Sequence, residues 1–162
     1  MKTTAEFRFA KPGDEQTVLD FIHGIAKYEK LENQVVNTVE MLNKELFVDK
    51  SIEVLFVLEQ DKPVCFALFF HNYSTFLGRC GLYLEDFFVL PEYRHKGYGK
   101  ALFCKLASIA VERNWGRMEW VCLDWNKPSI DFYKSMQAQT MDGWSTYRLT
   151  GDTLKNVADL SK

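Results

Sequence analysis

The sequence predicts an α/β protein built on a mixed β-sheet flanked by helices. Residues 52–58 and 64–73 are apolar runs rich in β-branched and aromatic residues, and a short polar turn joins them as in a β-hairpin. Residues 81–89 form a third such run, and a glycine-containing turn and a helical pattern follow directly. A strand, a helix and a further strand in succession predict a parallel pair. A ligand is therefore expected at the carboxyl ends of these strands.

The remaining elements follow from local patterns. Asp14 and Thr38 each precede an apolar stripe at helical spacing, and both are good N-cap residues. In chain order we expect a strand at 6–9, helices after Asp14 and after Thr38, the three strands above, a helix at 100–113, a strand at 118–123, a helix at 127–136, a strand at 141–148 that closes the sheet, and a helix at 152–160.

Length and composition limit the possible classes of protein. The 162 residues fit one domain over residues 1–162, and a hydrophobic content of 47% excludes a disordered chain. The net charge of −2 gives no reason to expect a nucleic-acid partner. No apolar run reaches the length of a membrane span, and the first residues lack the apolar core of a signal peptide. We expect a cytoplasmic protein without a membrane partner.

The four cysteines, Cys65, Cys80, Cys104 and Cys122, are scattered and contain no C-x-x-C pair. This spacing favours reduced thiols in the core of a cytoplasmic protein over a disulfide framework. The three histidines stand far apart in the sequence, so no metal is expected.

The stretch from Leu82 to Ala101 carries the main functional signal. A strand stopped by Pro91 runs into a basic glycine turn that opens a helix. Backbone N–H groups and the helix dipole at such a helix start attract anions, and glycine lets the backbone approach a phosphate closely. Leu102 stands where a dinucleotide fingerprint has its third glycine, and Ala101 stands where a P-loop has Ser or Thr. Neither of these two motifs is present.

What remains is Arg94-x-x-Gly97-x-Gly99, which resembles the pyrophosphate-binding turn of the GNAT superfamily of N-acetyltransferases. The flanking segments 83–89 and 124–134 are similar to the diamine (spermidine/spermine) and thialysine N-acetyltransferase branch. The resemblance extends from about Phe7 to Ala158. It implies a single-domain GNAT-like mixed sheet whose central parallel pair splays around the cofactor, and it implies a homodimer.

The resemblance also implies acetyl-CoA as the co-substrate, held by the end of the central strand, the glycine turn and a later helix. The matching residues are Phe87, Phe88, Val89, Arg94, His95, Lys96, Gly97, Tyr98, Gly99, Lys100, Asn126, Pro128, Ser129 and Tyr133.

Acetyl transfer to an amine needs a base, because a primary amine has a pKa near 10.4 and is protonated at neutral pH. Glu85 and Asp86 are adjacent in the central strand, so one of them faces solvent. We expect this to be Asp86 and expect Glu85 to face the acetyl group. The resemblance implies that Glu85 takes the amine proton through water.

Tyr133 has two interpretations. On a helix beginning near Lys127 it can pack inward as a core tyrosine. A phenol with a pKa near 10 is also suited to protonate a leaving thiolate. The resemblance implies this second role, the general acid.

The acceptor is expected to be a small cationic amine. A charged segment at a helix end, such as the one that contains Tyr28 and Glu29, is usually a solvated surface. The resemblance implies instead that Tyr28, Glu29 and Asp142 contact the acceptor together with Glu85. Spaced anions suit a diamine, a polyamine or a thialysine-like amino acid.

Two other functions stay open: a CoA-binding sensor without catalysis, and an acetyltransferase that acts on a protein or peptide amine. The pair Glu85 and Tyr133 argues against the first, and the acids of the expected groove argue against the second. Nothing marks a covalent nucleophile, which favours direct attack in a ternary complex. Gln137 stands where the family usually has glycine, so the preceding helix must end differently or accept backbone strain.

Overall fold

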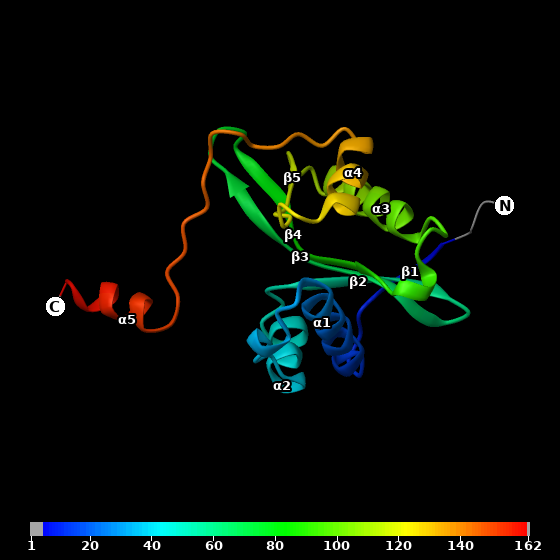
Figure 1. The fold of residues 1–162 in the computed structure, drawn as a ribbon, viewed down its shortest axis with the longest axis horizontal. Coiled ribbons are helices and arrows are strands. Elements are labelled where there is room, and N and C mark those ends of the chain that lie inside the picture. The colour runs from blue at the N-terminus through cyan, green and yellow to red at the C-terminus, as the bar shows by residue number, and fades with distance from the viewer. Residues whose placement is uncertain (1–4, 162) are drawn as a thin grey trace. The chain divides into compact units, whose positions relative to one another are not determined.

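The computed structural model describes residues 5–161 and contains a five-stranded sheet in the order β1-β2-β3-β4-β5 (Figure 1). The first four residues, part of the segment expected to lack a signal peptide, lie outside this range. The chain divides between Val121 and Cys122 into two compact units. One domain over residues 1–162 therefore stays a prediction.

The predicted mixed sheet is confirmed. Neighbouring strands pair antiparallel from β1 to β4, and β4 pairs parallel with β5 through Leu82–Met118 and Tyr83–Glu119. The strand predicted at 118–123 is shorter than expected. The strands are β1 (Glu6–Phe9), β2 (Glu53–Glu59), β3 (Lys62–Ser74), β4 (Arg79–Val89) and β5 (Met118–Glu119).

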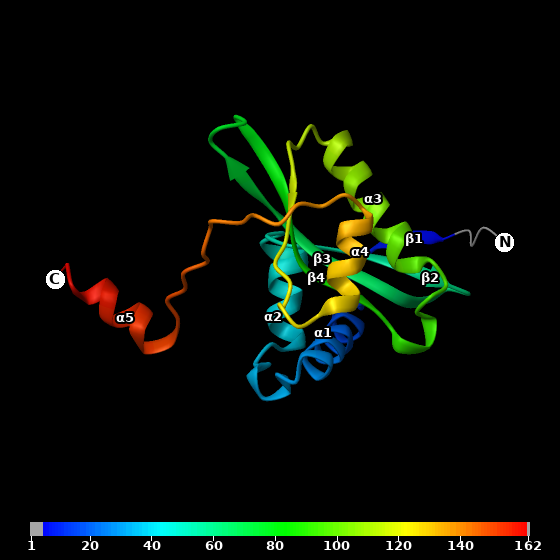
Figure 2. The same ribbon diagram turned by 45° about the horizontal axis from the view of Figure 1, so that its top comes forward.

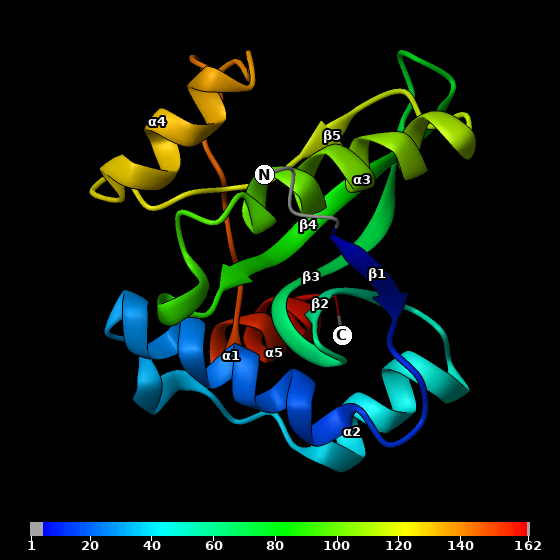
Figure 3. The ribbon, with the colours of Figure 1, turned by 90° about the vertical axis from the view of Figure 1, so that its right-hand side faces the viewer.

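Helices cover both faces of the sheet in the first unit (Figures 1 and 3). The helices α1 (Glu15–Glu29) and α2 (Val39–Asn43) lie on one face, and α3 (Tyr98–Glu112) lies on the other. This double cover explains why residues 54–58 of β2 and 64–69 of β3 are buried without alternation. Short helical turns complete the unit: η1 (Glu32–Gln34), the π-helical η2 (Lys44–Val48) and η3 (Pro91–Tyr93).

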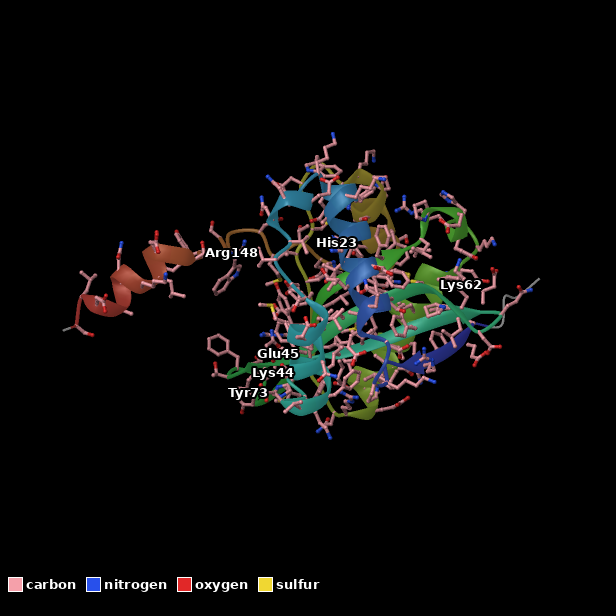
Figure 4. All side chains as sticks on the ribbon, turned by 90° about the horizontal axis from the view of Figure 1, so that it is seen from below. His23, Lys44, Glu45, Lys62, Tyr73 and Arg148 are labelled. Carbon is pink, nitrogen blue, oxygen red and sulfur yellow. The ribbon has the colours of Figure 1, made fainter. Side chains whose placement is uncertain are left out.

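The strands β3 and β4 are longer than the rest of the sheet. β3 pairs with β2 as far as Phe69, and its last residues pair with β4 alone. Figure 2 shows this two-stranded end projecting beyond β2, and Figure 4 labels Lys62 and Tyr73 near opposite ends of β3. The two-stranded end leaves Tyr73 59% exposed.

The two predicted N-caps have different outcomes. Thr38 caps α2 as expected, because its hydroxyl oxygen accepts a hydrogen bond from the Met41 amide at 3.2 Å. Asp14 precedes α1 but makes no capping bond to the helix. Its carboxylate is held 2.6 Å from the Arg8 guanidinium and accepts a bond from the Lys11 amide at 2.8 Å. The ion pair with β1 replaces the cap.

The second unit contains α4 (Lys127–Ser135) and α5 (Gly151–Asp159). Both helices begin and end within one residue of the predicted ranges, 127–136 and 152–160. The strand predicted at 141–148 is wrong. These residues are exposed, and the structure pairs them with no strand within the described range. Alternating side chains favour a strand, but a strand forms only where a neighbouring backbone completes the hydrogen-bonded ladder.

The prediction of four core thiols holds only for Cys65, which is buried. Cys104 is exposed because it lies off the apolar stripe of α3, while Cys80 and Cys122 are half-buried. None of the four forms a disulfide. Between residues 5 and 161, no helix is long and apolar enough to cross a membrane.

Candidate active site

The glycine turn connects β4 to α3 and leaves the start of that helix open to an anion. Gly97 is the N-cap residue with φ 86°, in the left-handed region that favours glycine, and no side chain caps the helix. The first N–H groups of an α-helix have no acceptor within the helix. The amides of Tyr98, Gly99 and Lys100 therefore present donors at the positive end of the α3 dipole.

Gly97 and Gly99 are favoured for different reasons. A Cβ atom at Gly97 would meet nothing within 4 Å, so this position favours glycine for its backbone angle alone. A Cβ atom at Gly99 would lie 3.3 Å from Val89 Cγ2 and 3.8 Å from Phe87 Cζ. Gly99 thus lets the first turn of α3 pack directly against the end of β4. The backbone angle thus favours glycine at position 97, and close packing favours it at position 99.

Arg94 joins the turn to the end of α1. Its guanidinium carbon lies 5.3 Å from the centroid of the Tyr28 ring and 5.3 Å from that of Phe88. Its Nε donates a hydrogen bond to the Val89 carbonyl at 3.2 Å. Figure 3 shows the loop after β4 beside the last turn of α1. Tyr28, predicted as an acceptor residue, therefore also contacts a predicted cofactor residue.

A β-bulge reverses the expected exposure of the two acids in β4. Leu84 pairs with Phe69 and Asp86 with Leu68, so Glu85 is the extra residue without a partner on β3. A bulge interrupts the in–out alternation of a strand. Glu85 is exposed, whereas Asp86 is largely shielded. The prediction that Asp86 faces solvent is wrong.

Three carboxylates interact around the bulge. Burial, followed by the charges of Glu85 and Glu29, raises the pKa of Asp86 from 3.8 to about 7. Burial also raises the pKa of Glu29. Sequence reasoning missed Asp86 because two adjacent acids do not reveal which of them a bulge turns inward. The cluster gives this end of β4 a negative potential that suits a cation.

The site residues predicted in the second unit lie at the start of α4, within it or in the segment after it. Asn126 is buried at its N-cap position, Pro128 lies in its first turn, and Ser129 is half-buried. Tyr133 is half-buried, and burial, followed by the nearby Cys122, raises the pKa of its phenol. Asp142 lies in an exposed turn.

The helix exit accepts the strain expected from Gln137. This residue has φ 64°, in the left-handed region, and the Ala138 amide donates to the Tyr133 carbonyl at 3.1 Å. Glutamine therefore performs the role that glycine has at such helix ends.

No three His, Cys, Asp or Glu side chains of residues 5–161 converge as a metal site.

Comparison with known proteins identifies similar chains. Residues 22–137 match the acetyltransferase (GNAT) family. The thialysine N-epsilon-acetyltransferase of Caenorhabditis elegans is 32% identical over 151 residues, which cover 91% of this chain and 93% of that protein. The L-ornithine N5-acetyltransferase of Arabidopsis thaliana is 46% identical over 96 residues, 59% of this chain and 42% of that protein. A solved integron cassette protein of V. cholerae superimposes with a TM-score of 0.79 at 23% identity, over 96% of this chain and 98% of that one.

Proposed function

The chain belongs to the acetyltransferase (GNAT) family, and on that premise we propose that it transfers the acetyl group of acetyl-CoA to a primary amine of a small cationic acceptor. One observation carries this proposal: the acids cluster around Glu85 and Asp86, and the uncapped start of α3 packs through Gly99 against Val89, at the end of the same strand. The helix start suits a phosphate and the acids suit an amine. The end of β4 would therefore have a site for an anion and a site for a cation near one another.

The turn has the properties that a pyrophosphate requires. The amides of Tyr98, Gly99 and Lys100 are directed along the axis of α3 without a capping side chain. Arg94 and Lys96 add positive charge from the same turn. These residues would hold acetyl-CoA, with Phe87, Phe88 and Val89 along β4 and the α4 residues Asn126, Pro128 and Ser129. The bound acetyl-CoA supplies the thioester.

Glu85 is proposed as the base. Removing the proton of an amine with a pKa near 10.4 costs roughly 4–5 kcal/mol at pH 7, so the site must accept this proton as the nitrogen attacks. Exposed Glu85 can receive it through water. Asp86 lies next to it with a pKa of about 7, which is well matched to a proton acceptor at neutral pH. Asp86 therefore joins Glu85 as a residue to be tested for this step.

Tyr133 is proposed as the acid. Because burial raises the pKa of its phenol, the hydroxyl stays protonated at neutral pH. In direct attack the C–N bond forms, the C–S bond breaks, and the phenol proton passes to the departing sulfur. No covalent intermediate on the protein is required, so both substrates are bound together in a ternary complex.

The proposed acceptors are a diamine, a polyamine or a thialysine-like amino acid. The negative cluster of Glu29, Glu85 and Asp86 supports an acceptor with positive charge beyond the reacting nitrogen. The two named relatives carry thialysine and ornithine in their names, and both compounds are amino acids with a side-chain amine. Asp142 is proposed as a further acceptor residue. We also propose a cytoplasmic homodimer that needs no metal.

The test is an acetylation screen with free CoA thiol as the readout and mass spectrometry of the product. Diamines, polyamines, thialysine, ornithine, a monoamine without a second charged group and a peptide are compared at equal concentration, with a reaction without amine as the control. Transfer to the compounds with a second ammonium group, with little to the monoamine, is expected. Transfer to the peptide alone would support a protein acetyltransferase. CoA binding without transfer to any amine would support a sensor.

A further inference from the structure

A tyrosine between the two glycines links the proposed cofactor turn to a different part of the sheet. Tyr98 is the first residue of α3 and only 3% exposed. Its hydroxyl donates a hydrogen bond to a carboxylate oxygen of Glu59, the last residue of β2. The β2–β3 turn begins directly after Glu59. A contact 39 positions apart in sequence thus connects the helix start to this hairpin.

Lysines on both sides strengthen the same connection. The Lys96 ammonium lies 3.4 Å from the Glu59 carboxylate and 4.7 Å from the centroid of the Tyr93 ring. The Lys62 ammonium, from the hairpin, lies 5.5 Å from the same ring. Residues of the β4–α3 connection (Tyr93, Lys96 and Tyr98) therefore form one cluster with residues of the hairpin (Glu59 and Lys62).

We propose that Glu59 is a positioning residue for the cofactor turn, which it fixes through the Tyr98 hydroxyl so that the amides of residues 98–100 face one phosphate. This inference rests on the proposed function. The turn needs such support because His95 and Gly97 both have left-handed φ angles, of 62° and 86°. A glycine-containing segment loses much conformational freedom when it is ordered. Ordering it before the ligand arrives improves affinity.

The hydroxyl is not needed for packing. The buried ring of Tyr98 fills its position in the core as a phenylalanine ring would, and only the hydroxyl reaches Glu59. The bond to Glu59 raises the pKa of Tyr98 to about 12, and the same bond lowers the pKa of Glu59. The donor and the acceptor therefore keep their forms across the neutral range.

The Glu59 charge would by itself repel a phosphate at the start of α3. Lys96 offsets this charge at 3.4 Å, and Lys96 is itself close enough in sequence to Gly97 to contribute to anion binding. The useful part of Glu59 is thus its capacity to accept a hydrogen bond. A glutamine at this position keeps an acceptor and removes the repulsion, whereas an alanine removes both.

The experiment measures CoA affinity by calorimetry and the acetyl-CoA KM and kcat for Tyr98→Phe, Glu59→Ala and Glu59→Gln in the full chain. Tyr98→Phe and Glu59→Ala should each weaken CoA binding about tenfold, the effect of losing one hydrogen bond to a charged group, with kcat within about twofold. The double variant Tyr98→Phe/Glu59→Ala should bind CoA no more weakly than either single variant, because both changes remove the same hydrogen bond. Glu59→Gln should bind CoA at least as tightly as the wild type, because it keeps the acceptor and removes the repulsion. Tyr73→Phe, at the exposed end of β3, is the matched control.

The outcomes separate this inference from the proposed function. If the wild type fails to bind CoA, the proposed function is wrong. If the wild type binds CoA and Tyr98→Phe or Glu59→Ala binds it equally well, the positioning role is wrong. A parallel loss of kcat, CoA affinity and thermal stability that Glu59→Gln does not rescue would also overturn it, because that pattern belongs to general structural damage. Glu59 is near the surface, so its variants keep the test valid if Tyr98→Phe does not fold.

Discussion

Replacing Asp86 by asparagine should make the protein more stable at high pH. Burial, with the charges of Glu85 and Glu29, raises the pKa of Asp86 from 3.8 to about 7. Between these values the folded protein holds a proton that the unfolded chain has released, so the free energy of unfolding falls as pH rises. The slope is about 1.4 kcal/mol per pH unit, and the whole shift amounts to on the order of 4 kcal/mol. Asparagine keeps the size of the side chain and removes the titration.

The assay is urea unfolding of the wild type and Asp86→Asn at pH 5.5 and pH 8. Most of the remaining titration lies between pH 5.5 and 7, so the advantage of Asp86→Asn should be about 2 kcal/mol larger at pH 8 than at pH 5.5. Asp61→Asn, in the exposed β2–β3 turn, is the matched control and should show no such change. Parallel stability curves for the wild type and Asp86→Asn would refute a raised pKa at this position.

Three further predictions concern activity. Tyr133→Phe should lower kcat by about 10²–10⁴-fold with acetyl-CoA affinity nearly intact; a variant that keeps its kcat in steady-state assays would make Tyr133 a packing residue. Gly99→Val should weaken acetyl-CoA binding at least about tenfold while circular dichroism stays unchanged, because its side chain would crowd Val89, 3.3 Å from the added Cβ; equal affinity in calorimetry would contradict this. Glu29→Gln combined with Asp142→Asn should raise KM for a dicationic acceptor more than it changes kcat, and an unchanged KM would remove these two acids from the acceptor site.

The sequence was most informative where structure depends on neighbouring residues. The β2–β3 turn, read from its polar residues, has Gln60 and Asp61 with φ angles of 51° and 62°, which is the two-residue turn that matches the twist of a hairpin. The helix after the glycine turn was predicted from residue 100 and begins at Tyr98. Glycine and apolar spacing determine these features within a few residues, so one sequence is enough to predict them.

The errors arise where distant residues decide the structure. The bulge at Glu85 depends on how β4 pairs with β3, and no pattern within β4 announces it. The strand predicted at 141–148 has suitable residues but no partner in the sheet described here. The Tyr98–Glu59 bond likewise joins two segments that no local pattern connects. The glycine motif is visible in the sequence, whereas the contact of Tyr98 with Glu59 is visible only in the fold.

The position of Asp86 at the bulge lowers the stability of the free protein at high pH and favours the binding of a cation. Asp86 is turned inward beside Glu29 and Glu85, and its ionised form is unfavourable there because burial and like charges both oppose it. A cationic acceptor placed at the same cluster would offset this repulsion and favour the ionised form. The instability expected at high pH in the free protein and the attraction for a cation then have the same physical origin. Removing the Asp86 charge should therefore improve stability and weaken acceptor binding together, as is common where a binding site retains an unfavourable charge.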